Sequence, residues 1–149
     1  MDLVRIYLDV CALKRPFDDA GDPRVRLEAE AVLNLLEIHP ARVQIIRSPA
    51  QTAENDRNPL AWCAERARRI LATFEAIVWD AAWLEQRTAE LMTRGFRNFD
   101  ALHLARGEFA GADVFVTTDD RLLRLCQREA AGLKLRALDP ILITREVSP

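Results

Sequence analysis

Four acidic residues of the chain could together hold a metal ion: Asp9, Glu54, Asp100 and Asp119. Carboxylates about 4 Å apart repel one another by roughly 4 kcal/mol at an effective dielectric constant of 20, so such a cluster needs cations or protons to offset the repulsion. Magnesium and manganese prefer carboxylate oxygens and keep several waters. An ion of this kind can polarise a phosphoryl oxygen and generate hydroxide from water. The chemistry to expect from the four acids is therefore chemistry at phosphorus.

Each acid also has a structural explanation when it is taken alone. Asp9 and Asp119 follow apolar runs and could be turn or N-cap residues. Asp100 would suit the dipole of a helix start, and Glu54 could be a solvated helix residue. The metal hypothesis therefore depends on the fold bringing the four acids together.

Two of the acids end apolar, β-rich runs. Residues 3–8 predict a buried strand that stops at Asp9, and residues 114–118 predict another that stops at Asp119 and Asp120. In a parallel sheet the carboxyl ends of the strands share one edge, and ligands bind there at the point where the strand order reverses. We expect Asp9 and Asp119 to point into that crevice.

The other two acids lie near predicted helix starts. Ser48 and Gln51 form a capping box with proline between them, which predicts a helix that carries Glu54 in its second turn. Asn98 is expected to cap a helix with Asp100 in its first turn.

The remaining pattern completes an α/β fold. Further strands are predicted at 43–46, weakly at 76–79, and at 133–137; further helices are predicted at 23–38, from 59 to 74, 81–94 and 121–131, and no clear period follows Pro140. We predict one domain over residues 1–149, a three-layer α/β/α sandwich with a mostly parallel sheet of about five strands.

Composition narrows the class of protein. The 149 residues are 50% hydrophobic with a formal net charge of -2 and a pI near 5.7. No apolar stretch approaches the ~18 residues that a membrane span needs, and the N-terminus lacks a signal-peptide pattern. Three cysteines without a C-x-x-C pair favour a reducing, cytoplasmic location. The pI argues against a protein that coats duplex nucleic acid, for which values above about 9 are usual.

Four segments in register resemble the PIN domain family, which includes ribonuclease toxins of the VapC type. The segments are YLDVCAL with Asp9, SPAQTAEN with Glu54, NFDALHLA with Asp100 and FVTTDDRLL with Asp119. The KRPFDD loop after the first acid resembles a subgroup of PIN proteins. After Asp9 the family often has Thr and Asn, where this chain has Val10 and Cys11, so a hydroxyl and an amide that could tighten the site are missing.

The resemblance implies a metal-dependent endoribonuclease that cleaves single-stranded or loop RNA by in-line attack of water. It implies that Asp9, Asp100 and Asp119 hold one or two Mg²⁺ or Mn²⁺ ions and that Glu54 is a ligand or orients the water. Asp120 could replace Asp119 if the strand register shifts by one. The resemblance also implies a homodimer and an antitoxin protein that holds the enzyme inactive as the second member of a toxin-antitoxin pair.

Supporting roles are predicted from position. Thr117 or Thr118 could hydrogen-bond the fourth acid, Asp119. Arg15, Arg97 and Arg121 are candidates for binding the RNA backbone, because phosphate contacts position a strand.

Two further features each have a functional and a structural explanation. One helix face carries Trp62, Arg66 and Arg69, and it suits either base stacking or an ordinary solvated surface. His103 follows Asp100 by three residues, but a histidine in the run ALHLA is more often packed than ligating.

Other function classes fit less well. A haloacid-dehalogenase phosphatase needs an acid two residues after Asp9, where Cys11 stands, and a receiver needs a late lysine where only Lys134 is found. A glycine-rich phosphate loop is absent from the sequence. A non-catalytic module that docks a protein partner or RNA is the serious alternative. Stabilisation by magnesium or manganese discriminates it from a nuclease, since a binding module does not require metal.

Overall fold

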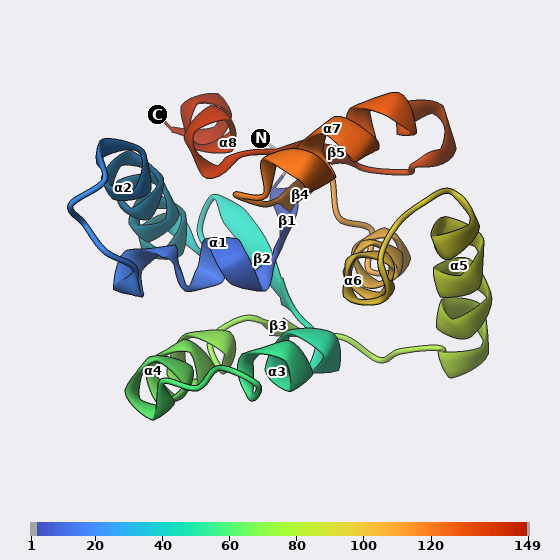
Figure 1. Cartoon of the computed structure of the whole chain (residues 1–149), viewed down its shortest axis with the longest axis horizontal. Helices are drawn as coiled ribbons and strands as arrows, with labels where there is room; N and C mark the ends of the chain where they lie inside the picture. The colour runs from blue at the N-terminus through green and yellow to red at the C-terminus, as the bar shows by residue number, and fades with distance from the viewer. Residues whose placement is uncertain (1–2, 149) are drawn as a thin grey trace.

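A parallel β-sheet of five strands forms the centre of the molecule, in the computed structural model that describes residues 3–148. The strand order is β3-β2-β1-β4-β5, with β1 in the middle (Figure 1). The strands are β1 Val4–Leu8, β2 Val43–Arg47, β3 Glu75–Ala76, β4 Val114–Val116 and β5 Arg136–Leu138. Every pairing is parallel, so the predicted sheet is confirmed and is parallel throughout.

Helices cover both faces of the sheet. They are α1 Val10–Leu13, α2 Pro23–Ile38, α3 Pro49–Asn55, α4 Ala61–Leu71, α5 Ala81–Thr93, α6 Asn98–Phe109, α7 Asp120–Arg128 and α8 Pro140–Val147, with short 3₁₀ turns at Arg15–Phe17 and Ala130–Gly132. Side chains of α5, α6 and α7 fill the core on one face, and side chains of α1, α2, α4 and α8 fill the core on the other. The predicted three-layer α/β/α architecture is thereby confirmed.

The central strands alternate between the two cores. Tyr7 and Phe115 point to the core under α6, while Ile6, Leu8 and Val116 point to the opposite core. The residues of these strands are almost wholly buried because the sheet is covered on both faces. The register pairs Tyr7 with Phe115, which sets the ends of β1 and β4 side by side.

Local signals positioned most helix starts correctly. Asp22 caps α2 with Pro23 at its first position, Ser48 and Gln51 form the capping box of α3, and Asp80 caps α5. Each cap offers a side-chain oxygen to backbone N–H groups that the helix itself leaves without partners.

Other boundaries differ from the predictions because neighbouring elements decide them. The third strand is only Glu75–Ala76, since Val78 points into solvent with 93% of its surface exposed and Trp79 packs on Phe109. The last strand is Arg136–Leu138, because it pairs along the short strand β4.

Three helical segments also differ from the predictions. The helix expected from 59 to 74 is shorter, since α4 spans Ala61–Leu71. The 121–131 helix ends at Arg128, and its final turn becomes a separate 3₁₀ turn. Helix α8, which the sequence pattern did not reveal, begins after the cap Asp139 and buries Ile143 completely. No helix within residues 3–148 has the length and apolarity that crossing a membrane requires.

Candidate metal centre

Asp9 is the first residue after β1, at the carboxyl edge of the sheet. The strand order reverses between β1 and β4 at this point, and the Asp9 N–H donates to the Val116 carbonyl at 2.9 Å. The Asp9 side chain is 6% exposed and accepts hydrogen bonds from the Val10 N–H at 2.9 Å and the Thr117 hydroxyl at 2.8 Å. It also accepts a bond from the Cys11 thiol at 3.3 Å. Cys11 stands where the PIN family often has Asn, and its thiol supplies a supporting contact to Asp9 at this position.

The Asp9 carboxylate is strongly desolvated. Burial raises its pKa above the ordinary value of 3.8, while His103, Thr117 and Cys11 each act in the opposite direction. Three donated hydrogen bonds only partly replace the lost water. A cation beside Asp9 would complete the compensation.

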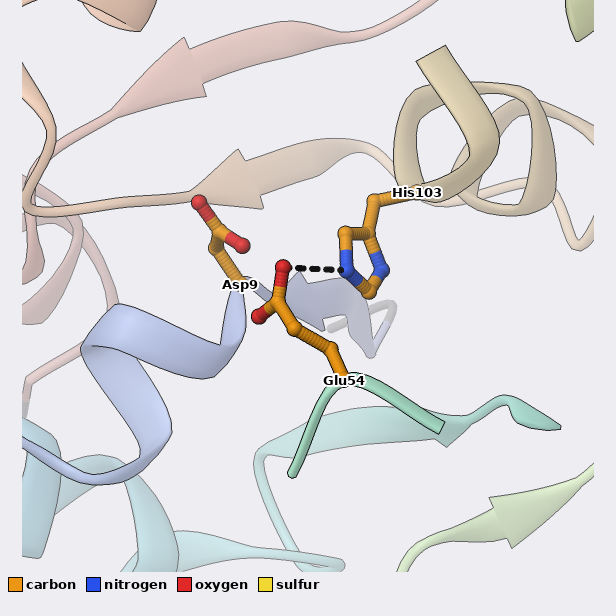
Figure 2. Close-up of side chains that lie close together, drawn as sticks. All are labelled: Asp9, Glu54 and His103. Carbon is orange, nitrogen blue, oxygen red and sulfur yellow. Dashed lines mark ion pairs between the residues drawn. The ribbon is translucent and has the colours of Figure 1, made fainter. Parts of the chain in front are cut away.

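Glu54 and His103 face Asp9 from two helices. Glu54 comes from α3 and His103 from α6, and the Glu54 Oε1 lies 3.5 Å from the His103 Nε2 (Figure 2). One ligand atom from each of the three residues lies within 4.8 Å of the others. Nε2 is buried and has no hydrogen-bond partner within residues 3–148. Two carboxylates and an unpartnered imidazole nitrogen fit a divalent cation.

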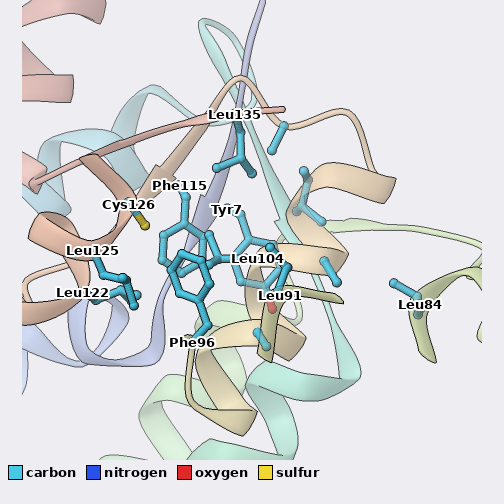
Figure 3. Packing of buried hydrophobic residues seen from close by; sticks show 14 residues of the cluster. Tyr7, Leu84, Leu91, Phe96, Leu104, Phe115, Leu122, Leu125, Cys126 and Leu135 are labelled. Atoms are coloured by element: carbon cyan, nitrogen blue, oxygen red, sulfur yellow. The ribbon is translucent and has the colours of Figure 1, made fainter. Parts of the chain in front are cut away.

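Tyr7 holds the other nitrogen of this imidazole. The Tyr7 Oη lies 2.6 Å from the His103 Nδ1, and both side chains are completely buried. Tyr7 projects from β1 into the core beside Phe115 and Leu104 (Figure 3). Burial raises the pKa of its phenol far above the ordinary value, so the hydroxyl keeps its proton. The hydroxyl can donate to Nδ1 or accept from it, and in either tautomer Nε2 is directed at the carboxylates.

Gly107 lies where α6 packs against Leu135 and Tyr7. A β-carbon at this position would lie 3.0 Å from the Leu135 Cδ2, which is a tight contact, and 3.5 Å from the Tyr7 Cβ, which is an ordinary one. The glycine therefore leaves room chiefly for the Leu135 side chain.

Asp100 and Asp119 form a second acidic pair, joined by Arg121. The Arg121 Nη2 lies 2.7 Å from the Asp100 Oδ2 and 3.5 Å from the Asp119 Oδ2. Asp119 also caps α7 through the Leu122 N–H. The structure therefore divides the four acids into two pairs, and Asp100 and Asp119 lie outside the group formed by the first pair and His103.

Thr117 connects the two pairs. Its hydroxyl donates to the Asp9 carboxylate at 2.8 Å and accepts from the Asp119 N–H at 3.1 Å. The predicted contact of a threonine with the fourth acid is thus made to the Asp119 backbone. Thr118 is buried next to it.

Other predicted site residues are engaged elsewhere. Asp120 points away to Arg24, with contacts of 2.7 and 2.6 Å, and this hydrogen-bonded guanidinium lowers the pKa of Asp120. Arg15 bonds to Asp18 at 3.0 Å and lies 3.3 Å from the buried Glu28. Both side chains therefore already have partners of opposite charge.

Two predicted cations differ in their pairing. Arg97 is exposed at the start of α6 and has no ion-pair partner among residues 3–148. Arg121 is committed to the two aspartates.

The sequence analysis favoured a packed role for His103 over a ligating one, and it did not identify Tyr7. His103 is packed and hydrogen-bonded as expected, yet its second nitrogen faces the acids. The signal for Tyr7 was available, since it is the only tyrosine of the chain and its hydroxyl interrupts an otherwise apolar strand that must be buried.

Comparison with solved structures also supports the α/β fold described above. The chain is similar to PAE2754 from Pyrobaculum aerophilum, with 20% identity, a TM-score of 0.57, and coverage of 99% of this chain and 98% of the other. It is also similar to a chain of the crystal structure of VapBC2 from Rickettsia felis bound to a promoter DNA fragment, with 17% identity, a TM-score of 0.59, and coverage of 91% and 98%. The chain has a PIN-like fold.

Among the comparisons with known proteins, those with solved structures are the ones that find similar chains. Neither a protein-family model nor a curated protein sequence matches the chain. The similarity at 17% and 20% identity therefore concerns the path of the backbone. The roles of individual side chains must be argued from the site itself.

Proposed function

We propose that this chain is a metal-dependent endoribonuclease that hydrolyses phosphodiester bonds of RNA. The observation that carries the proposal is the group of buried Asp9, half-buried Glu54 and buried His103, whose ligand atoms lie within 4.8 Å of one another. The group lies at the carboxyl edge of the sheet, where the strand order reverses, and this is where α/β folds bind ligands. The PIN-like fold, shared with VapBC2, supports the nuclease class.

The acidic residues have different proposed roles in binding the metal ion. A bound Mg²⁺ or Mn²⁺ ion supplies a Lewis acid for the phosphoryl oxygen and lowers the pKa of water. Asp9 and Glu54 hold the ion, and Glu54 also orients the attacking water. Asp100 and Asp119 complete the set directly or through water, and Arg121 is their counter-charge in the absence of metal.

His103 is assigned as a third ligand through Nε2, and Tyr7 and Thr117 are assigned as positioning residues. Tyr7 fixes the imidazole so that Nε2 meets the Glu54 carboxylate, and Thr117 fixes the Asp9 carboxylate. Such supporting hydrogen bonds are typical of metal sites and orient the ligands that the ion contacts.

RNA cleavage by the purified chain is the direct test. The chain is incubated with unstructured and hairpin RNAs in manganese, in magnesium and in chelator, beside Asp9→Asn and Asp100→Asn. We expect cleavage only with metal, and a loss of about a hundredfold or more in each variant, because loss of outer partners alone costs about 10- to 100-fold. Glu37→Gln, an exposed acid on α2, is the matched control. RNA that survives in every metal, or variants that cut as well as the parent, would refute the proposal.

A non-catalytic module that docks a protein partner or RNA is the second candidate. The observation in its favour is Arg121, which neutralises Asp100 and Asp119 without metal. Thermal unfolding with and without manganese separates the two candidates. A ligand at 100 times its Kd stabilises a fold by about 2.7 kcal/mol, so a metal enzyme shows a clear increase in Tm and the module shows none.

The proposed setting is a cytoplasmic toxin-antitoxin pair. Cys11, Cys63 and Cys126 are all free thiols, which suits a reducing compartment. VapBC2 suggests an antitoxin partner for the present chain. Leu27 and Leu33 leave more than half of their surface exposed on α2, which favours a protein contact such as a homodimer. Size-exclusion chromatography with light scattering tests the dimer.

A further inference from the structure

A small cavity adjoins the candidate metal centre on the side of α1. Its volume is about 250 Å³, and Glu54 and Cys11 form the wall that it shares with the centre. The rest of its polar lining consists of Lys14 at the end of α1, Asn55 at the end of α3, and Arg57 and Asn58 after α3. The cavity is below the ~300–1,000 Å³ typical of sites for drug-sized ligands. It therefore suits one phosphate group with part of a sugar.

Lys14 and Arg57 give this cavity a positive excess. Within residues 3–148, neither has an acidic partner at ion-pair distance, unlike Arg15 and Arg121. Glu54 is the only acid in the lining. Two cations against one carboxylate leave one net positive charge beside the metal centre, which favours an anion.

Aromatic side chains lie near residues that line the cavity. The Arg57 guanidinium lies 5.4 Å from the centre of the Phe99 ring, and Phe99 stacks near His103. Phe17 follows the lining residue Lys14 by three positions and contacts Trp62 edge-on, with ring centres 6.3 Å apart.

Trp62 offers a stacking surface. It is 52% exposed although it is a large apolar side chain, and the Arg66 guanidinium lies 5.8 Å from its ring centre. Trp62 follows the lining residue Pro59 by three positions. Cationic side chains combined with an exposed aromatic ring are typical of surfaces that bind single-stranded nucleic acid. A duplex does not present its bases for such stacking.

We propose that this cavity binds a phosphodiester of single-stranded RNA one step away from the bond that is cut. Lys14 and Arg57 bind the phosphate, and Trp62 stacks on a base of the same strand. The inference rests on the proposed nuclease function, which defines the cut bond relative to which the bound phosphate is placed. Lys14 and Arg57 take the role of binding the RNA backbone that was predicted for Arg15 and Arg121. Cavity and metal centre share Glu54, so a strand bound in one passes directly to the other.

Binding in chelator tests the cavity separately from cleavage. Fluorescence anisotropy of a labelled single-stranded RNA is measured over a range of salt concentrations. The proteins are the parent, Lys14→Gln with Arg57→Gln, Lys14→Arg with Arg57→Lys, Trp62→Ala, and the control Arg42→Gln. Arg42 is an exposed arginine just before β2, at the opposite end of the sheet.

The double Gln variant is expected to bind about tenfold or more weakly. The slope of its log K against log salt should fall by about 0.7, because Lys14 and Arg57 bind one phosphate and each neutralised phosphate of a single strand contributes about 0.7. The charge-conserving variant restores most of the slope. Trp62→Ala weakens binding by about fivefold or more with the slope unchanged, since stacking is worth about 1–3 kcal/mol per base. Arg42→Gln binds like the parent.

The outcomes keep the two proposals distinguishable. If the parent does not bind the RNA in chelator, or if the double Gln variant binds as tightly and with the same slope, the cavity proposal is overturned even when the chain cuts RNA in manganese. If binding depends on Lys14 and Arg57 but no metal supports cleavage, the nuclease proposal falls and the cavity remains an RNA site.

Discussion

The Tyr7 hydroxyl lies 2.6 Å from the His103 Nδ1 in the middle of the apolar core. The two residues come from the central strand and from α6. This buried contact aims the other imidazole nitrogen at Glu54 and so links the packing of the core to the geometry of the acids.

Tyr7→Phe tests that link, because it removes one oxygen and leaves Nδ1 buried without a partner. Loss of a partner to a buried polar group costs about 1–3 kcal/mol, so the free energy of unfolding in urea should fall by that amount. Affinity for manganese, measured by calorimetry, should fall by about 10- to 100-fold. His103→Leu serves as the second arm of a double-mutant cycle, and additive effects of the two changes would show that the contact carries no coupling.

Arg121→Gln should make the chain more dependent on metal. The substitution leaves Asp100 and Asp119 to repel each other without their counter-charge. We expect a lower Tm in chelator and a larger increase on adding manganese, by about 2–4 °C for each kcal/mol of repulsion that the ion relieves. Arg124→Gln, an exposed arginine of the same helix, should behave like the parent. An unchanged manganese response in Arg121→Gln would contradict the assignment of these acids to the metal.

The raised pKa of Asp9 predicts a pH dependence. Between the ordinary value of 3.8 and the raised value, the folded chain binds more protons at Asp9 than the unfolded chain does. The contribution of Asp9 to stability in chelator therefore falls as pH rises through this interval. Metal requires the carboxylate, so the increase in Tm caused by manganese should grow over the same interval. Thermal melts from pH 4 to 7 measure both trends, and Asp9→Asn should flatten each of them.

Cys11 should react slowly although it is partly exposed. Burial and the nearby Asp9 raise the pKa of its thiol to about 12, so at pH 8 only about 1 in 10⁴ molecules carries the thiolate that attacks an alkylating reagent. Mass spectrometry of the chain treated with iodoacetamide should show slow labelling at Cys11, with faster labelling in Asp9→Asn. Equal rates in both proteins would mean that the Cys11 to Asp9 contact is not made in solution.

The sequence by itself determined most of the elements and the position of two acids at the ends of parallel strands. Runs of β-branched and apolar residues predicted β1 and β4, and capping residues such as Ser48 predicted the helix starts, because both signals act within a few residues. The position of Asp9 and Asp119 after parallel strands followed from the same local patterns.

Only the tertiary structure decided which charges meet. Asp100 is held by Arg121, Asp120 turns to Arg24, and His103 reaches Tyr7, 96 positions away in the chain. Such pairings depend on how α2, α6 and α7 pack on the sheet and on the rotamers that burial allows. Neither of these leaves a local pattern in the sequence. For the same reason Lys14 and Arg57 were not recognised from the sequence. These two cations lie beside Glu54 without an acidic partner among residues 3–148, which only the packing of the helices shows.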